Sequence, residues 1–275
     1  MKCIFLLIAS NNFEHQLDEA TQRKTWAKEL PNVIWLRGGE STIFDPYDRN
    51  LYVPVEETYE NILKKTILGI NWCLENLEFD FLIRGNVSTY FVPERLNTLL
   101  GKINCKEDFF GGYVEFMSIE NQSKRECLFI NGSALFLSRS VAEKVSSINV
   151  SDWNEIPDDF AISRSLFSQG VVPTSIARGN IGQNSIFGKR AFYRLKSSEN
   201  AYMASLRMEN VDRILKEPRK FRRLIGILRY YKNEFMFWKK NYRTLYGYIL
   251  SAYSVLASML NCFLISKTVG IKHVR

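Results

Sequence analysis

Two adjacent aspartates follow a proline in the stretch Ile156-Pro157-Asp158-Asp159-Phe160. Proline fixes its own φ and favours extended backbone in the residue before it, so it suits the start of a helix. The positive end of the helix dipole then stabilises carboxylates in the first turn. A carboxylate held there beside a cleft can take a proton from a hydroxyl group, which is general-base chemistry. The same aspartates could instead only cap the helix, so the pair by itself leaves both interpretations open.

The elements that must position these carboxylates are strands and helices in alternation. Apolar runs predict buried strands at residues 4–9, 33–36 and 79–84 and a glycine-bearing strand at 129–139, and helices are predicted around 21–26 and over 55–72. This alternation predicts a mainly parallel sheet covered by helices. In such sheets ligands bind beyond the carboxyl ends of the strands. We therefore expect Arg84 through Ser88, and the loop after Leu36, to lie at a binding site.

Five short motifs follow one another along the same part of the chain. They are Arg23-x-Thr25-Trp26, Tyr59-x-Asn61-x-x-x-Lys65-Thr66, the pair Gly111-Gly112, the Gly132 strand that ends Leu137-Ser138-Arg139, and the turn Pro157-Asp158-Asp159. Their order and spacing, over residues 3–175, resemble the fringe-like, β-1,3-galactosyltransferase family of glycosyltransferases. The resemblance implies a GT-A-like α/β domain, expected over residues 1–205, that transfers a sugar from a nucleotide-sugar donor.

The sequence departs from this family where a metal ion would be held. The family has an aspartate cluster after the strand that ends here at Arg84, but this sequence reads Asn86-Val87-Ser88. The family's late metal-binding histidine is also missing, because the only histidines are His15 and His273. Hard cations prefer oxygen ligands that include carboxylates. We therefore expect no metal site, and the sequence gives no support for a Mn²⁺ or Mg²⁺ cofactor: either the enzyme works without metal, or the fold has lost its chemistry.

The resemblance assigns the general base to Asp159, with Asp158 shaping the turn or binding the acceptor. Attack in line, on the face opposite to the leaving group, inverts the anomeric configuration. Retention would need a nucleophile on the other face, and the sequence offers no candidate for one.

Donor binding without a metal requires fixed positive charge, because the leaving diphosphate gains negative charge. Arginine and lysine supply such charge in a dry cleft, where charge pairs interact more strongly than in water. As an alternative to donor binding, residues 189–196 form the solvated basic face of a helix, and Arg23 lies on the surface of its helix. The donor-binding candidates are Arg23, Arg84, Asn86, Ser88, Arg190, Arg194 and Lys196.

Four further residues are candidates for contact with the sugar or the acceptor. Gly111, Gly112 and Gly132 would let the backbone approach a ligand closely, or they are glycines needed for packing. Trp153 precedes the Pro-Asp-Asp turn and would stack on an acceptor sugar, or it belongs to the core.

The positive charge of the chain is concentrated in its last quarter. Between Lys216 and Leu245 ten Lys and Arg minus two Glu give +8, which equals the net charge of the whole chain. Apolar residues at 221, 224, 225 and 228 predict a basic amphipathic helix, and residues 244–266 carry no charge. We expect a basic, aromatic-rich helical extension over 206–275 that binds an anionic membrane surface through 216–266, lying on it or spanning it, or that packs on the domain. Nucleic acid is not an expected partner, because no nucleic-acid motif frames this segment.

Composition favours a cytoplasmic, membrane-associated protein, at the cytoplasmic face of the inner membrane if it is bacterial. The five cysteines are scattered without C-x-x-C spacing, so we interpret them as reduced core residues. The apolar run after Lys2 is short and lacks a signal-peptide cleavage site, so we interpret it as a strand. The sequence thus predicts an inverting glycosyltransferase that moves a sugar, from a UDP-sugar, to a glycan or lipid-linked glycan in lipopolysaccharide or capsule assembly. The alternative is a catalytically inactive protein of the same fold that binds sugar nucleotides or glycans.

Overall fold

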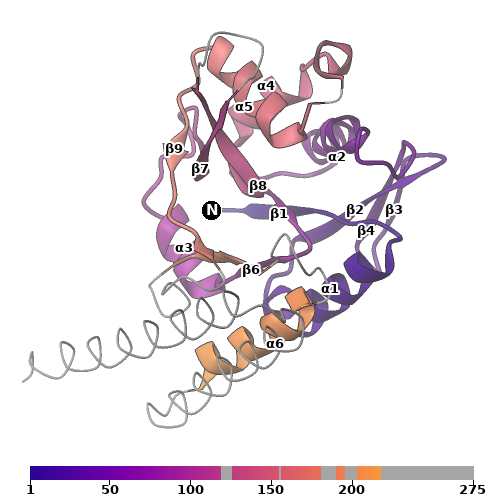
Figure 1. The fold of residues 1–275 in the computed structure, drawn as a ribbon, viewed down its shortest axis with the longest axis vertical. Coiled ribbons are helices and arrows are strands. Elements are labelled where there is room, and N and C mark those ends of the chain that lie inside the picture. Colours follow the sequence, from indigo (N-terminus) through magenta and orange to yellow (C-terminus); the bar gives the residue numbers. More distant parts are fainter. Residues whose placement is uncertain (119–125, 155, 181–189, 196–202, 218–275) are drawn as a thin grey trace, which may run out of the picture.

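A computed structural model describes residues 1–217, apart from 119–125, 155, 181–189 and 196–202 (Figure 1). The described residues form an α/β fold around an eight-stranded sheet, which confirms the predicted fold class. In spatial order its strands are β3 (Ile43–Asp45), β4 (Asn50–Pro54), β2 (Val33–Gly39), β1 (Cys3–Ile8), β5 (Phe81–Asn86), β8 (Glu126–Ser138), β7 (Phe110–Ser118) and β9 (Thr174–Ser175).

The centre of this sheet is parallel. Strands β4, β2, β1 and β5 are parallel neighbours, while β8 joins the far side of β5 in the antiparallel direction. The chain moves outward from β1 through β2 to β4 and then returns to place β5 on the other side of β1. Strands β1 and β5 end at the same level, since Ile8 lies opposite Asn86. In open α/β sheets ligands bind where the strand order reverses in this way, so a crevice is expected beyond Ile8 and Asn86.

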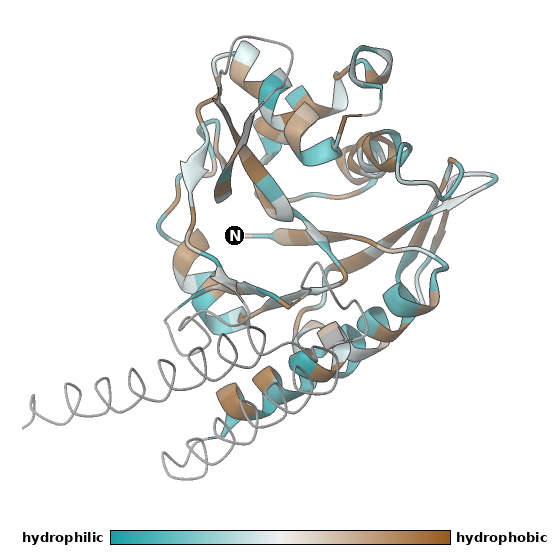
Figure 2. Ribbon diagram, in the orientation of Figure 1, coloured by the Kyte–Doolittle hydropathy of each residue, from teal (hydrophilic) through white to brown (hydrophobic). Residues whose placement is uncertain are grey.

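Both faces of the sheet are buried, because successive side chains of a strand point to opposite faces. In β1, Phe5 and Leu7 join one core, and the alternate residues join the other. One face packs against α2 (Ile62–Asn76), α4 (Arg139–Ser146) and α5 (Asp158–Ser168). The other lies on the side of α1 (Phe13–Lys24), α3 (Pro93–Leu100) and α6 (Met203–Lys216), as Figure 1 shows. Figure 2 shows hydrophobic residues along the central strands and mixed hydropathy along α1.

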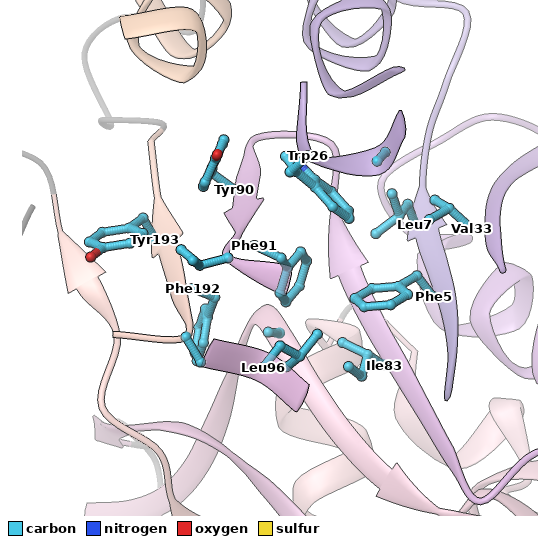
Figure 3. Packing of buried hydrophobic residues seen from close by; sticks show 14 of the residues in the cluster. Phe5, Leu7, Trp26, Val33, Ile83, Tyr90, Phe91, Leu96, Phe192 and Tyr193 are labelled. Carbon is cyan, nitrogen blue, oxygen red and sulfur yellow. The ribbon is translucent and has the colours of Figure 1, made fainter. Parts of the chain in front are cut away.

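An aromatic cluster joins the large sheet to a second, three-stranded sheet on the α1 side (Figure 3). The Phe91 ring packs edge-on against Phe5 and Trp26, with ring centroids 5.2 and 5.0 Å apart, and it stacks on Phe192. Phe91 belongs to β6 (Thr89–Phe91), which pairs with β11 (Phe192–Arg194), and β11 pairs with β10 (Gly179–Asn180). This packing fixes the segment that follows β5 against the segment that ends at Arg194.

The structure corrects the prediction of a helix over residues 55–72. The helix begins at Ile62, and the preceding residues form turns, in which the Glu57 carboxylate accepts a hydrogen bond from the Gly38 N–H. Strands β3 and β4, which the sequence did not predict, form an antiparallel pair before it. The strand predictions at 4–9, 33–36 and 79–84 are confirmed with small shifts of their ends.

The predicted boundary between residues 205 and 206 falls within α6. Buried side chains of this helix, such as Met208 and Val211, belong to the same core as β1. The remainder of the predicted tail, including 244–266, lies outside the described residues. No helix in the described part of the chain has both the length and the apolar character needed to cross a bilayer. Of the cysteines whose side chains are described, Cys3, Cys73 and Cys105 are free thiols.

Candidate active site

Arg84 is the charged exception in a buried central strand. In β5, Phe81 and Ile83 point to the α1 side, whereas Leu82 and Arg84 point to the α5 side. The Arg84 side chain is only 2% exposed, so its charge requires partners. It lies at the carboxyl end of β5, next to the point where the strand order reverses. A buried charge at this position indicates a functional site.

The Arg84 guanidinium holds together three parts of the chain. Its Nη2 lies 2.7 Å from Asp158 Oδ2, and its Nη1 donates to the Gly132 carbonyl at 2.5 Å and to Asn86 Oδ1 at 3.0 Å. Its buried Nε has no hydrogen-bond partner among the described residues. Arg84 therefore neutralises Asp158 and fixes the backbone at Gly132, and most of its donors are already used.

Asp159 lies in the first turn of α5 with both carboxylate oxygens anchored. Oδ2 accepts a hydrogen bond from the Gly132 N–H at 2.6 Å, and Oδ1 accepts one from the Phe160 N–H at 2.9 Å. Burial raises the pKa of Asp159 above its ordinary value of 3.8, and the Asp158 carboxylate raises it further. Arg84 and the two N–H groups act in the opposite direction on this pKa. The result is a half-buried carboxylate in a fixed orientation, more basic than an exposed aspartate.

The raised pKa of Asp159 predicts how pH affects stability. Between the ordinary pKa and the raised one, the folded protein holds this proton more tightly than the unfolded chain does. Folding stability therefore falls as pH rises through this window, because the folded state binds more protons there. Urea unfolding of the wild type and of Asp159→Asn from about pH 4 to pH 7 should show the wild type losing stability relative to the variant. A difference that stays constant or changes in the opposite direction would contradict the assigned environment.

Asp158 has a different role from its neighbour. It is buried, it is paired with Arg84, and it accepts a hydrogen bond from Thr66 Oγ1 at 3.2 Å. These contacts tie α5 to α2 and to β5. They agree with the expected shaping of the turn by Asp158, while binding of the acceptor by this residue stays a prediction.

Tyr59 lies beside both carboxylates, and the sequence quoted it only as part of a motif. Its side chain is 67% exposed. Burial of the hydroxyl raises the pKa of Tyr59, and the charges of Asp159 and Asp158 raise it further. An exposed aromatic ring next to a candidate base is suited to contact with an acceptor sugar. Nothing in the sequence around Tyr59 indicated that this residue, which precedes α2, would lie near the two carboxylates.

Arg23 is held by partners instead of lying free on its helix. Its guanidinium donates twice to Glu19 and once to Asn50 Oδ1, and it lies 3.6 Å above the centre of the Trp35 ring. Glu19 also pairs with Arg37. Arg23, Glu19, Asn50 and Arg37 line a cavity of about 270 Å³ between α1 and the strands β2 and β4. Arg23 thus lines a polar cavity, and donor binding there stays a prediction.

Arg194 lies beside residues 86–88, where the family that the sequence resembles has its aspartate cluster. It is opposite Thr89 in the pairing of β11 with β6, and the next residue, Leu195, donates its N–H to the Ser88 carbonyl at 3.1 Å. Arg190 is exposed, and its carbonyl accepts a hydrogen bond from Arg95. Lys196 lies outside the described residues.

The candidate glycines separate into two groups. A Cβ atom at Gly132 would lie 2.9 Å from Arg84 Nη1 and 3.0 Å from Asp159 Oδ2, so the site requires glycine there. A Cβ at Gly111 would meet the Phe109 ring, and one at Gly112 would lie 2.4 Å from the Ala134 carbonyl oxygen. These two glycines are inside the sheet, paired with β8 and β9, which agrees with the packing alternative.

Trp153 ends the short helix η2 (Val150–Trp153) and is half-buried against the core on the α2 side. The structure therefore brings together one group of predicted residues and leaves Gly111, Gly112 and Trp153 outside it. That group consists of Arg84, Asn86, Gly132, Asp158 and Asp159.

Residues 86–88, at the end of β5, do not fit a hard divalent cation. Asn86 Oδ1 already accepts a hydrogen bond from Arg84, and no carboxylate occurs at 86–88. The described residues contain no group of three or more His, Cys, Asp or Glu side chains that would hold a metal ion. Mn²⁺ and Mg²⁺ require oxygen ligands that normally include carboxylates. No reaction step is therefore assigned to a metal at this place.

Comparison with known proteins finds similarity only to solved structures. No known protein family matches the sequence, and no curated protein matches it. One similar solved structure is a glycosyltransferase involved in the glycosylation of the major capsid of PBCV-1, with 10% identity, a TM-score of 0.49, and coverage of 75% of this chain and 98% of the other. Another is the inositol-1-phosphate CTP transferase from T. maritima, with 9% identity, a TM-score of 0.44, and coverage of 76% and 96%. A third, a putative glucose-1-phosphate thymidylyltransferase from Bacillus anthracis, has 8% identity, a TM-score of 0.40, and coverage of 64% and 87%. These likenesses concern the fold, so the function must be argued from the site.

Proposed function

We propose that this protein is an inverting glycosyltransferase of the fringe-like type. It would transfer a sugar from a nucleotide sugar, a UDP-sugar, to a hydroxyl group of a glycan. The observation that carries the proposal is Asp159, a half-buried carboxylate oriented by the N–H groups of Gly132 and Phe160. It lies beside Arg84, which is at the carboxyl end of β5, where open α/β sheets bind their ligands.

Asp159 acts as the general base in this proposal. Each of its oxygens accepts one hydrogen bond and retains capacity for another, so the carboxylate can accept the proton of the incoming hydroxyl. The acceptor oxygen forms its bond to the anomeric carbon while the bond from that carbon to the diphosphate oxygen breaks. The electron pair leaves with the nucleoside diphosphate, and the proton stays on Asp159. Attack from the face opposite to the leaving group inverts the anomeric centre.

The leaving diphosphate is stabilised by fixed cations instead of a metal ion. Arg194 supports this part of the proposal, because it lies opposite Thr89, directly after residues 86–88, where the fringe-like family has its aspartates. Arg190 and Lys196 belong to the same basic stretch. Positive groups that are already in place stabilise the negative charge of the transition state, because they do not have to move as that charge develops. Arg84 contributes indirectly, because it keeps Asp158 and Gly132 in place.

The acceptor is proposed to be a glycan or lipid-linked glycan at a membrane surface. The support for this is the basic segment from 216 onward followed by the charge-free run 244–266, which would bring the domain close to anionic lipid. A cytoplasmic enzyme of lipopolysaccharide or capsule assembly fits this combination.

Transfer or donor hydrolysis that survives EDTA is the result that tests the proposal. Full-length protein is incubated with a panel of sugar nucleotides, in EDTA and in Mn²⁺, and release of nucleoside diphosphate is measured. Thermal shift on the same panel identifies the bound donor, because a ligand that binds the folded state raises the melting temperature. Turnover in EDTA with one donor is expected. Binding without turnover, under both conditions and with glycan acceptors present, would support an inactive sugar-nucleotide-binding protein instead.

A further inference from the structure

Arg178 is another buried arginine, and the sequence gave it no role. Its side chain is 7% exposed and follows β9, on the opposite side of β8 from Arg84. Nη1 donates to Asn131 Oδ1 at 2.6 Å and to Ser133 Oγ at 3.0 Å, and Nη2 pairs with Glu115 at 3.1 Å. The guanidinium also lies 3.9 Å from the centre of the Tyr113 ring. The orientation of this arginine is therefore fixed.

Arg178 and Asp159 bind neighbouring residues of one short segment, 131–133. Gly132 binds Asp159 through its N–H and Arg84 through its carbonyl, while the side chains on both sides of it, Asn131 and Ser133, bind Arg178. Successive side chains of a strand point to opposite faces, so the carboxylates and Arg178 lie on the two sides of this segment. Residues 131–133 also extend past the pairing of β8 with β5, which ends at Ala134 opposite Gly85. The segment therefore borders the crevice at the carboxyl end of β5.

Arg194 approaches Arg178 from the small sheet. In the pairing of β11 with β10 it lies opposite Asn180, two residues after Arg178. It is half-buried, and its side chain makes no hydrogen bond or ion pair within the described part of the chain. Burial lowers the pKa of Arg178, Glu115 raises it, and the nearby charge of Arg194 lowers it again. Two guanidinium groups thus lie near one another, and the Glu115 carboxylate is bound to that of Arg178. The charge of Arg194 has no counter-ion among the residues that the structure describes, and its side chain is partly desolvated.

We propose that Arg178 and Arg194 form an anion site for the diphosphate of the donor, with Glu115 as the internal counter-ion that competes with it. The assignment to a donor rests on the proposed function, whereas the anion site itself follows from the two arginines. Arginine suits this task because its planar fork binds phosphate oxygens in a bidentate manner. Thr89 Oγ1, which donates to the Ser133 carbonyl, keeps β6 and β8 together beneath the site.

Two substitutions with opposite expected effects test the anion site. Binding of inorganic pyrophosphate, UDP and uridine to the full-length protein in EDTA is measured by isothermal titration calorimetry. Arg194→Ala should weaken binding of pyrophosphate and UDP by roughly tenfold or more, the size expected for lost hydrogen bonds to a charged group. Glu115→Gln should tighten both by roughly threefold or more, because it removes the competing negative charge. Uridine, which lacks phosphate, should bind all variants alike.

Matched controls separate this site from general charge effects. Arg213→Ala removes an exposed arginine of α6, and Glu143→Gln removes an exposed carboxylate of α4. Both should bind UDP as the wild type does. Arg194→Lys keeps the positive charge but lacks the planar guanidinium. It replaces Arg194→Ala in the experiment if that variant is thermally unstable. It should still bind pyrophosphate and UDP more weakly than the wild type does.

The inference is overturned if the wild type binds neither pyrophosphate nor UDP in EDTA. It is also overturned if Arg194 variants bind like the wild type, or if Glu115→Gln does not bind more tightly. If these variants behave as expected and no sugar is transferred, the anion site stands and the proposed transfer fails. If sugar is transferred while the variants bind unchanged, only the anion site fails.

Discussion

Replacing Asp159 with asparagine is expected to lower the kcat of transfer by about 10²–10⁴-fold, the contribution of a well-placed general base. Asparagine has nearly the same shape, and its oxygen can still accept one of the two hydrogen bonds now made by Gly132 and Phe160. Its amide group cannot take the proton of the acceptor hydroxyl. The donor should therefore bind with little change in its dissociation constant, while turnover is lost. The kinetics are measured with the donor identified in the thermal-shift panel, and donor binding by calorimetry.

Asp152→Asn is the matched control for this prediction, because Asp152 is exposed on η2 and hydrogen-bonded to Asn149. It should transfer sugar at the wild-type rate. Asp159→Asn with kcat within a few-fold of the wild type would remove Asp159 from the mechanism. Loss of donor binding together with turnover would indicate that Asp159 shapes the site and does not act as the base.

The central parallel strands were predictable from sequence because their side chains are buried in a hydrophobic core on each face of the sheet. In β1 and β2 nearly every position is apolar, as a strand buried on both faces requires. Strands β3 and β4 escaped prediction because they are short and carry polar residues such as Asp45 and Asn50. The start of α2 was placed too early, because the turns before Ile62 depend on Glu57 binding Gly38, a contact between distant residues.

The candidate site was predictable where a motif marks it and unpredictable where it depends on tertiary pairing. The Pro-Asp-Asp turn and Gly132 were identified from sequence, and the structure joins them through the Gly132 N–H. The sequence also placed Arg84 near the site, but as a donor ligand. Its pairing with Asp158 became visible only when β5 and α5 were brought together. Arg178 gave one signal, a single arginine in an otherwise uncharged stretch, and that signal does not specify partners on β7 and β8.

Removing the charge of Arg84 is expected to have the largest effect on stability. Arg84→Met keeps a long apolar side chain in β5 but leaves Asp158 as an uncompensated charge, 9% exposed. Breaking a buried ion pair by removing one partner costs about 3–5 kcal/mol. The carbonyl of Gly132 and the amide of Asn86 also lose their donor. Urea unfolding should show this loss as a lower midpoint with an unchanged slope.

A double-mutant cycle distinguishes the ion pair from simple loss of packing. Asp158→Asn removes the charge that Arg84→Met leaves unpaired, so the double variant should be destabilised by less than the sum of the two single variants. Lys144→Met breaks the half-exposed pair between Lys144 and Asp108 and should cost only about 0–1 kcal/mol, as surface pairs do. Strict additivity at Arg84 and Asp158 would mean that the two charges do not stabilise one another. A double variant destabilised by less than the sum would instead mean that Arg84, the charged residue of β5, stabilises Asp158. Through Asp158 it would then hold the aspartate turn, and with it the base, at the carboxyl end of the sheet.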